Sequence, residues 1–314
     1  MVAVRRALIL LAATLTVPGC NASLKREDVQ GKTVQPKTQE QSSAPDGALA
    51  GRFYVKAGDK DLDADLYEMR FSPFGLDQLT KGSRVTTVGG CSTRVVVAAA
   101  QREVGYADRL QELRDGKLVP VEKLGLEIGS DPDVSDDCRI LYIRLAGGGP
   151  SSAEEIKLWD PTKAASTTVA SGPTVVGASW GPHGEIVILK RDPSGPRLLI
   201  QRSDGAKTEL DPGVPDVGNT PWGKSGWMAL AVFADPKKPP TATLFLNPSS
   251  DRGRSQLEGW LPLAWSPDGN RLLVRDSGAG TALGLVEMPD RTRVREIGRS
   301  TVGTVWDAVW LPQS

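Results

Sequence analysis

Residues 262–274 read Pro-Leu-Ala-Trp-Ser-Pro-Asp-Gly-Asn-Arg-Leu-Leu-Val. An apolar strand ends on Trp265, a polar tetrapeptide follows, and a second apolar strand begins at Arg271. Proline pre-sets the backbone of a tight turn, aspartate can accept a hydrogen bond from its own backbone, and glycine tolerates a positive φ. The stretch therefore predicts a β-hairpin.

The same hairpin pattern recurs along the chain. In each copy an apolar residue, usually tryptophan, ends one strand and a short polar turn leads to the next. These anchor residues are Val88, Val134, Trp180, Trp222, Trp265 and Trp310. Their spacings are 46, 46, 42, 43 and 45 residues. A period of about 44 residues with four short strands per unit is typical of a β-propeller blade.

The two ends of the repeat complement each other. Trp310 lacks the rest of its unit, whereas residues 52–80 contain three strand-like segments without a preceding anchor. One blade shared by both ends, with three strands from residues 52–80 and one from residues 302–311, would close a ring and remove exposed sheet edges. We therefore predict an all-β, six-bladed β-propeller over residues 50–314.

A family resemblance supports this prediction. The Trp265 hairpin, together with Asp65-Leu-Tyr-Glu-Met and Leu76-Asp-Gln-Leu-Thr, resembles the repeats of TolB-type propellers. The resemblance extends over roughly residues 50–314. It implies an envelope propeller that binds proteins.

The first twenty residues have the features of an export signal. Arg5 and Arg6 precede the apolar run 7–17, which is too short to span a bilayer. The sequence Val17-Pro-Gly-Cys20 resembles the bacterial lipobox, which implies cleavage after residue 19 and lipidation of Cys20. Ordinary signal cleavage beside an incidental cysteine is the alternative. We expect an exported protein that its lipid holds on the outer face of the cell membrane, or on an envelope membrane in a host with two membranes.

Residues 20–49 separate this signal from the propeller. After the cysteine they are rich in Ser, Gln, Lys, Pro and Asp and contain few aliphatic residues. Such a segment buries too little apolar surface to offset the entropy of ordering. A disordered linker is predicted. The whole chain balances 38 Lys and Arg against 38 Asp and Glu, so a nucleic-acid partner is not expected.

Cys91 and Cys138 are the remaining two cysteines, and each lies in the anchor turn of a neighbouring unit. An even pair in an exported domain indicates a disulfide. Free or metal-bound thiols are the alternative, although one pair without a nearby histidine supplies too few ligands for zinc.

Residues 218–225 match the phosphate-loop pattern letter for letter. The motif requires free backbone amides and a helix that starts at its Lys-Ser. Here Pro221 removes an amide, Trp222 fills the loop and a strand-like segment follows. No nucleotide binding is expected.

Two acidic segments are weak candidates for metal binding. Asp59, Asp61, Asp63 and Asp65 alternate, so they would share one face of a strand or converge in a loop on Ca²⁺. The pattern fails the EF-hand rule, and a solvated loop is the simpler interpretation. The second segment contains Asp131, Asp133, Asp136 and Asp137. No cofactor is predicted.

No catalytic residue is predicted, because His183 is the only histidine and it lies in an anchor turn of the repeat. We favour a non-enzymatic scaffold that binds an unidentified envelope protein or peptide. A Ca²⁺-dependent hydrolase or lyase is one alternative. A cell-wall glycan-binding module is another, and it would use the tryptophans outside the anchor register, which are Trp159, Trp227, Trp260 and Trp306.

Overall fold

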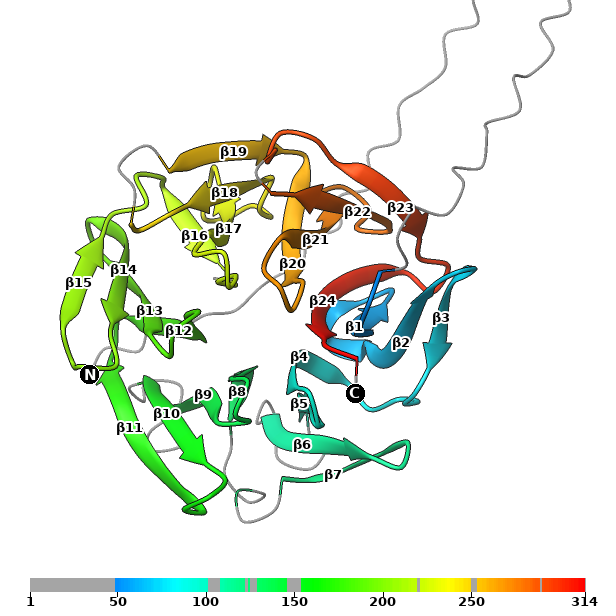
Figure 1. Ribbon diagram of the computed structural model, residues 1–314, viewed down its shortest axis with the longest axis horizontal. Helices are drawn as coiled ribbons and strands as arrows, with labels where there is room; N and C mark the ends of the chain where they lie inside the picture. The colour runs from blue at the N-terminus through cyan, green and yellow to red at the C-terminus, as the bar shows by residue number, and fades with distance from the viewer. Residues whose placement is uncertain are drawn as a thin grey trace, which may run out of the picture. The chain divides into compact units, whose positions relative to one another are not determined.

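The computed structural model describes residues 49–100, 108–121, 124, 129–145, 154–218, 221–249, 253–288 and 290–313. The predicted signal, Cys20 and all but the last residue of the predicted linker lie outside these ranges. The described strands form six four-stranded antiparallel sheets arranged as blades around a common axis (Figure 1). The predicted six-bladed propeller is confirmed. No helix in the described ranges is long and apolar enough to cross a membrane.

Each blade extends from an innermost strand at the axis to an outermost strand at the rim. Blade 1 contains, in this order, β24 (Thr304–Leu311), β1 (Arg52–Gly58), β2 (Asp65–Phe71) and β3 (Phe74–Gln78), with the 3-10 turn η1 (Asp61–Asp63) between β1 and β2. Blade 2 contains β4 (Val85–Cys91), β5 (Arg94–Ala100), β6 (Asp108–Arg114) and β7 (Lys117–Pro120). Blade 3 contains β8 (Ser130–Val134), β9 (Ile140–Leu145), β10 (Glu154–Asp160) and β11 (Ala165–Gly172).

The second half of the ring repeats this order. Blade 4 contains β12 (Val175–Trp180), β13 (Ile186–Asp192), β14 (Gly195–Gln201) and β15 (Lys207–Leu210). Blade 5 contains β16 (Asp216–Gly218), β17 (Met228–Phe233), β18 (Ala242–Leu246) and β19 (Arg254–Glu258). Blade 6 contains β20 (Trp260–Trp265), β21 (Arg271–Asp276), β22 (Ala282–Glu287) and β23 (Arg295–Arg299).

Blade 1 combines strands from both ends of the propeller, as the repeat predicts. The innermost strand β24 (red) lies antiparallel beside β1 (blue), with Arg52 opposite Leu311 and Phe53 opposite Trp310 (Figure 1). The Trp310 ring lies 4.3 Å from the Phe53 ring, and its indole N–H donates to the Ala50 carbonyl at 3.1 Å. The shared blade is confirmed.

The hydrophobic core lies between neighbouring blades. One cluster, for example, packs Tyr54 and Leu66 of blade 1 against Val85 and Val97 of blade 2. The middle strands are almost completely buried, as β18 shows, whereas the outer strand β15 is mostly exposed. Burial of apolar surface between the sheets therefore holds the blades together.

Tryptophan and glycine fit together at these interfaces. The Trp265 ring occupies the space above Gly223, where an added Cβ would lie 2.7 Å from a ring carbon. The Trp222 ring covers Gly181 in the same way, again at 2.7 Å. The predicted role of the anchor tryptophans in packing between blades is confirmed for this pair. The segment after residues 218–225 is also the predicted strand, β17, rather than a helix.

The predicted disulfide is present. Cys91 ends β4 of blade 2 and Cys138 lies in the turn after β8 of blade 3, and their sulfur atoms are bonded at 2.00 Å. The bond links two neighbouring anchor turns covalently.

Removal of this bond is expected to destabilise the ring. Closing a loop with a sequence separation of 47 residues contributes about 4 kcal/mol by the chain-entropy model, which is an upper limit. The double variant C91A/C138A should therefore unfold at a lower urea concentration than the oxidised wild type. Dithiothreitol should lower the wild-type midpoint to that of the variant and leave the variant unchanged. Equal midpoints for the oxidised wild type and the variant would contradict this expectation.

Candidate functional site: the central channel

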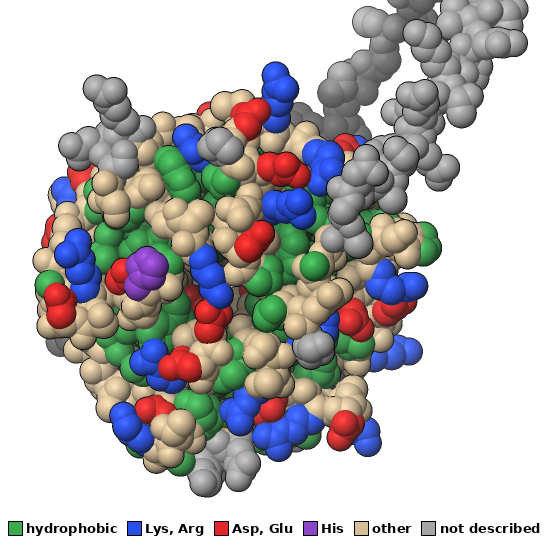
Figure 2. Space-filling model, viewed as in Figure 1, with side chains coloured by type: hydrophobic (Ala, Val, Ile, Leu, Met, Phe, Trp, Pro, Cys, Tyr) green, Lys and Arg blue, Asp and Glu red, His purple; other side chains and the backbone are tan. Residues whose placement is uncertain are grey.

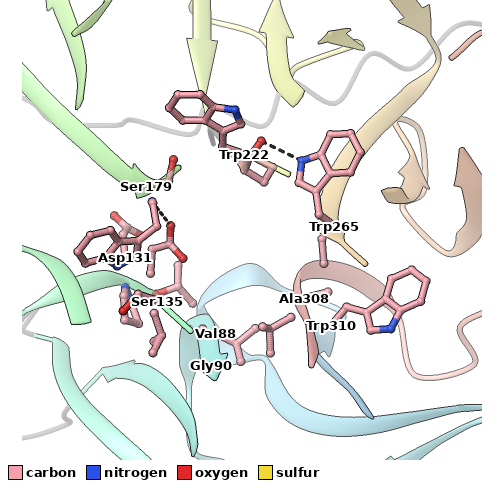
Figure 3. Close-up of a pocket in the computed structure, with 18 of the residues that line it drawn as sticks. Val88, Gly90, Asp131, Ser135, Ser179, Trp222, Trp265, Ala308 and Trp310 are labelled. Carbon is pink, nitrogen blue, oxygen red and sulfur yellow. Dashed lines mark hydrogen bonds between the residues drawn. The ribbon is translucent and has the colours of Figure 1, made fainter. Parts of the chain in front are cut away.

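The six innermost strands surround a channel with a volume of about 870 Å³. Its wall includes residues from every blade. Those labelled in Figure 3 are Val88, Gly90, Asp131, Ser135, Ser179, Trp222, Trp265, Ala308 and Trp310. The volume falls within the range of roughly 300–1,000 Å³ that is usual for ligand pockets. The channel is therefore the candidate site.

The channel has two different mouths. Strand β1 runs from Arg52, which donates to the carbonyl of Ser92 in an anchor turn, to Gly58, which pairs with Thr304 at the start of β24. The anchor turns therefore form one mouth, and η1 lies at the other. Figure 2 shows the anchor-turn mouth, because it displays the chain's single histidine amid Lys, Arg, Asp and Glu side chains. We call the opposite end the η1 mouth.

Lys56 is the most deeply buried charge in the channel wall. The residue is only 2% exposed, and its ammonium donates to the Thr86 carbonyl at 2.5 Å and to the Asp61 carboxylate. A buried ammonium requires such partners because its desolvation is costly. These contacts fix the lysine between blades 1 and 2, near the η1 mouth.

Every lysine and arginine of the channel wall, within the part of the chain that the structure describes, is ion-paired. The pairs are Lys56 with Asp61, Arg139 with Asp137 at 2.8 Å, Arg191 with Asp216 at 2.8 Å, and Lys224 with Asp136 at 2.7 Å. The last pair joins blade 3 to blade 5 at the anchor-turn mouth. Three further carboxylates, Asp131, Asp133 and Asp307, have no lysine or arginine partner within 4 Å among the described residues.

Two of these carboxylates bind the backbone of the next blade. Asp133 of β8 accepts a hydrogen bond from the Trp180 amide at 2.7 Å. Asp307 of β24 accepts one from the Val88 amide at 2.9 Å. Both donors belong to anchor residues. A carboxylate in one blade therefore holds the anchor of its neighbour.

The surroundings of these carboxyl groups raise their pKa values. Burial raises the pKa of Asp307 to about 7 and that of Asp133 to about 6, although backbone hydrogen bonds act in the opposite direction. Asp131 is accessible to water inside the channel. Its pKa is nevertheless raised, mainly by desolvation from the surrounding protein and secondly by the negative charge of Asp108. Desolvation disfavours the ionised form, and a nearby like charge adds to that effect.

The first acidic segment does not gather into one cluster. Asp61 pairs with Lys56, and Asp63 lies 3.7 Å from Arg84. Asp65 accepts hydrogen bonds from the amides of residues 82 and 83 at 3.0 and 2.9 Å, and so fixes the loop after β3. Asp59 lies in the bend before η1. The described residues contain no group of three or more His, Cys, Asp or Glu side chains placed to hold a metal ion.

The remaining candidates from the sequence, His183 and the tryptophans outside the anchor register, lie in different parts of the molecule. His183 is exposed at the anchor-turn mouth, where its backbone amide donates to Glu185 at 2.7 Å. Trp159 is only 3% exposed, so the expectation that it contributes to an exposed glycan-binding face is wrong. The guanidinium of Arg291 lies 3.8 Å from the centre of the Trp227 ring. Trp260 is half-buried against the core of blades 5 and 6, and Trp306 lines the channel.

Lys56 and Asp307 are channel residues that the sequence does not reveal. Neither belongs to a motif, and Asp307 differs from other aspartates only by lying three positions before the anchor Trp310. This distance from the anchor is a weak signal, because Asp133 makes the equivalent hydrogen bond but lies only one position before its own anchor, Val134. The acidic segment around Asp131 was recognised, but as a candidate metal site.

Comparison with family models and with curated proteins found no match. Solved structures do match. TolB from Acinetobacter baumannii superposes with a TM-score of 0.66 at 14% identity, over 85% of this chain and 68% of that chain. Tricorn protease gives a TM-score of 0.52 at 12% identity, over 81% of this chain and 30% of that chain. Puromycin hydrolase gives 0.51 at 16% identity, over 81% and 46%. These similarities establish the TolB-like propeller fold.

The Asp307 carboxyl group should make stability depend on pH. Its folded pKa of about 7 exceeds the ordinary value of 3.8, so the folded state binds a proton more tightly than the unfolded state. Its contribution is fully present below about pH 4 and is lost as the pH rises through about 7. Between pH 5 and 8 the unfolding free energy of the wild type should therefore fall by roughly 2–3 kcal/mol more than that of Asp307→Asn.

Urea unfolding at pH 5, 6.5 and 8 measures this difference. Asp77→Asn, which removes an exposed carboxylate from β3, is the control for loss of charge and should follow the wild type. Parallel pH profiles for the wild type and Asp307→Asn would show that this group does not titrate as described.

Proposed function

We propose that the protein is an exported, lipid-anchored and non-enzymatic propeller that binds a protein or peptide of the cell envelope at its central channel. The observation that carries the proposal is the 870 Å³ channel, to which all six blades contribute. A cavity of this size can admit several side chains of a partner. The TolB-like fold is consistent with a scaffold.

The contacts of the channel carboxylates also favour binding over catalysis. Asp133 and Asp307 already hold backbone amides of the next blade. The sole histidine, His183, stands on an exposed turn, and its hydrogen bond to Glu185 uses the backbone. We therefore assign the channel wall a positioning and recognition role.

Site-specific photocrosslinking in living host cells tests this function. A photoreactive amino acid at position 183 or 62 samples the two mouths, and one at the exposed Lys207 of β15 serves as the outer-strand control. We expect one discrete crosslinked envelope protein from at least one mouth position and none from position 207. The absence of a product at both mouths, or the same products at all three positions, would refute channel-mouth binding.

The anchor is tested separately. The lipobox-like sequence before Cys20 supports diacylation of that cysteine, and two or more acyl chains give durable membrane attachment. Cys20→Ala in the full chain should abolish incorporation of an alkyne fatty acid and move the protein out of the membrane fraction. Ser23→Ala, three residues away, should retain both properties. A wild-type protein that incorporates no fatty acid would exclude the lipid anchor.

A further inference from the structure

The charge of the channel is not balanced. Each lysine and arginine of the described wall already has its own carboxylate partner. Asp131, Asp133 and Asp307 are left over, so the channel has three surplus negative charges when these groups are ionised. Backbone amides solvate two of them but add no positive charge.

Asp131 lies near the start of β8, away from the anchor turn at the end of that strand, and Asp307 lies opposite Lys56 in the β24–β1 pair. They come from β8 and β24, whose blades flank blade 2, and the charge of Asp131 acts on the Asp307 carboxyl. Lys56 acts on both carboxyl groups, and Asp307 also acts on Arg275, whose guanidinium lies 5.6 Å from the centre of the Trp306 ring. The contacts of Lys56 with Asp61 and the Thr86 carbonyl hold it in place. The Asp131 side chain is exposed to the channel interior, where a ligand could contact it.

The rim of the η1 mouth adds an independent feature. Leu62 is the one exposed large hydrophobic residue of the described chain, at 54% exposure. It stands in η1 between Asp61 and Asp63, and Asp61 itself lines the channel. Asp61 and Asp63 are paired with Lys56 and Arg84, so Leu62 offers an apolar contact for a residue that flanks the cation of a partner.

We propose that the η1 mouth admits a lysine or arginine side chain of the bound peptide, and that Asp131 and Asp307 neutralise its charge. This inference rests on the proposed peptide-binding function and names its recognition chemistry. An anionic partner would increase the charge imbalance. A bare metal ion is disfavoured because the described carboxylates do not converge into a group of three ligands. A cation on a flexible side chain requires no such convergence.

The test is a binding titration of the full chain in detergent, by calorimetry, with two probes. The first is an acetylated and amidated peptide, Leu-Gly-Arg-Gly-Leu, and the second has Glu in place of Arg. The wild type should bind the Arg peptide and not the Glu peptide at pH 8 and low ionic strength, where Asp307 is ionised and screening is weak. The double variant D131N/D307N should weaken Arg-peptide binding at least tenfold, which is about 1.4 kcal/mol.

A matched control separates the channel from general charge. D77N/D204N also removes two carboxylates, both from exposed positions outside the channel, and should bind like the wild type. If the D131N/D307N pair fails to fold, D131N alone is the substitute, because Asp131 makes only a weak 3.5 Å contact with the Ser130 hydroxyl among the described residues. Equal weakening by the two pairs, no selectivity for Arg over Glu, or Ca²⁺ uptake at these carboxylates without peptide binding would overturn the proposal.

The outcomes also separate this inference from the proposed function. Suppose that a partner crosslinks at position 183 or 62 in cells but the protein shows no preference for the Arg peptide. This result would support the proposed binding function and refute the recognition of a cationic side chain. No crosslinked partner at either mouth would reject both.

Discussion

The pairing of β24 with β1 is the constraint on which the channel depends. Two residues at opposite ends of the propeller sequence, Arg52 and Leu311, lie opposite each other in this pair. The hydrogen bonds between these two strands close the ring by joining the last strand of the propeller to the first blade. The pairing holds blade 1 in the ring, and blade 1 contributes Lys56, Trp306 and Asp307 to the channel wall. The spacing between the Asp131 and Asp307 carboxyl groups, which come from blades 3 and 1, is therefore a consequence of this closure.

The carboxylates at the blade interfaces combine two properties. Asp133 and Asp307 bind the amide of the next blade's anchor, which helps to align neighbouring innermost strands. The same position places them where desolvation opposes their ionisation. Hydrophobic isosteres would avoid this cost but would leave the two amides without these acceptors. The charge of the channel is thus tied to how its wall is assembled.

The fold could be predicted because its signals are local. Each anchor hairpin contains its own turn residues, and the regular spacing from Val88 to Trp310 requires only counting. The channel could not be predicted, because the direction of a side chain on an innermost strand depends on register. Strands β4, β8, β12 and β20 each contain a register shift against their neighbour, which breaks the simple alternation of faces. The β24–β1 and β10–β11 pairs contain shifts of the same kind, so no sequence feature fixed the direction of Asp307 or Trp159.

The shared blade also has a consequence for biosynthesis. Ribosomes make proteins from the N-terminus, so β1, β2 and β3 emerge first and β24 emerges last. Until then β1 presents an unpaired edge, and native pairing at long sequence separation is slow to form. The nascent chain thus passes through a vulnerable interval in which blades 2 to 6 can already be assembled while the first remains incomplete. A chaperone that shields the β1 edge would act during this interval.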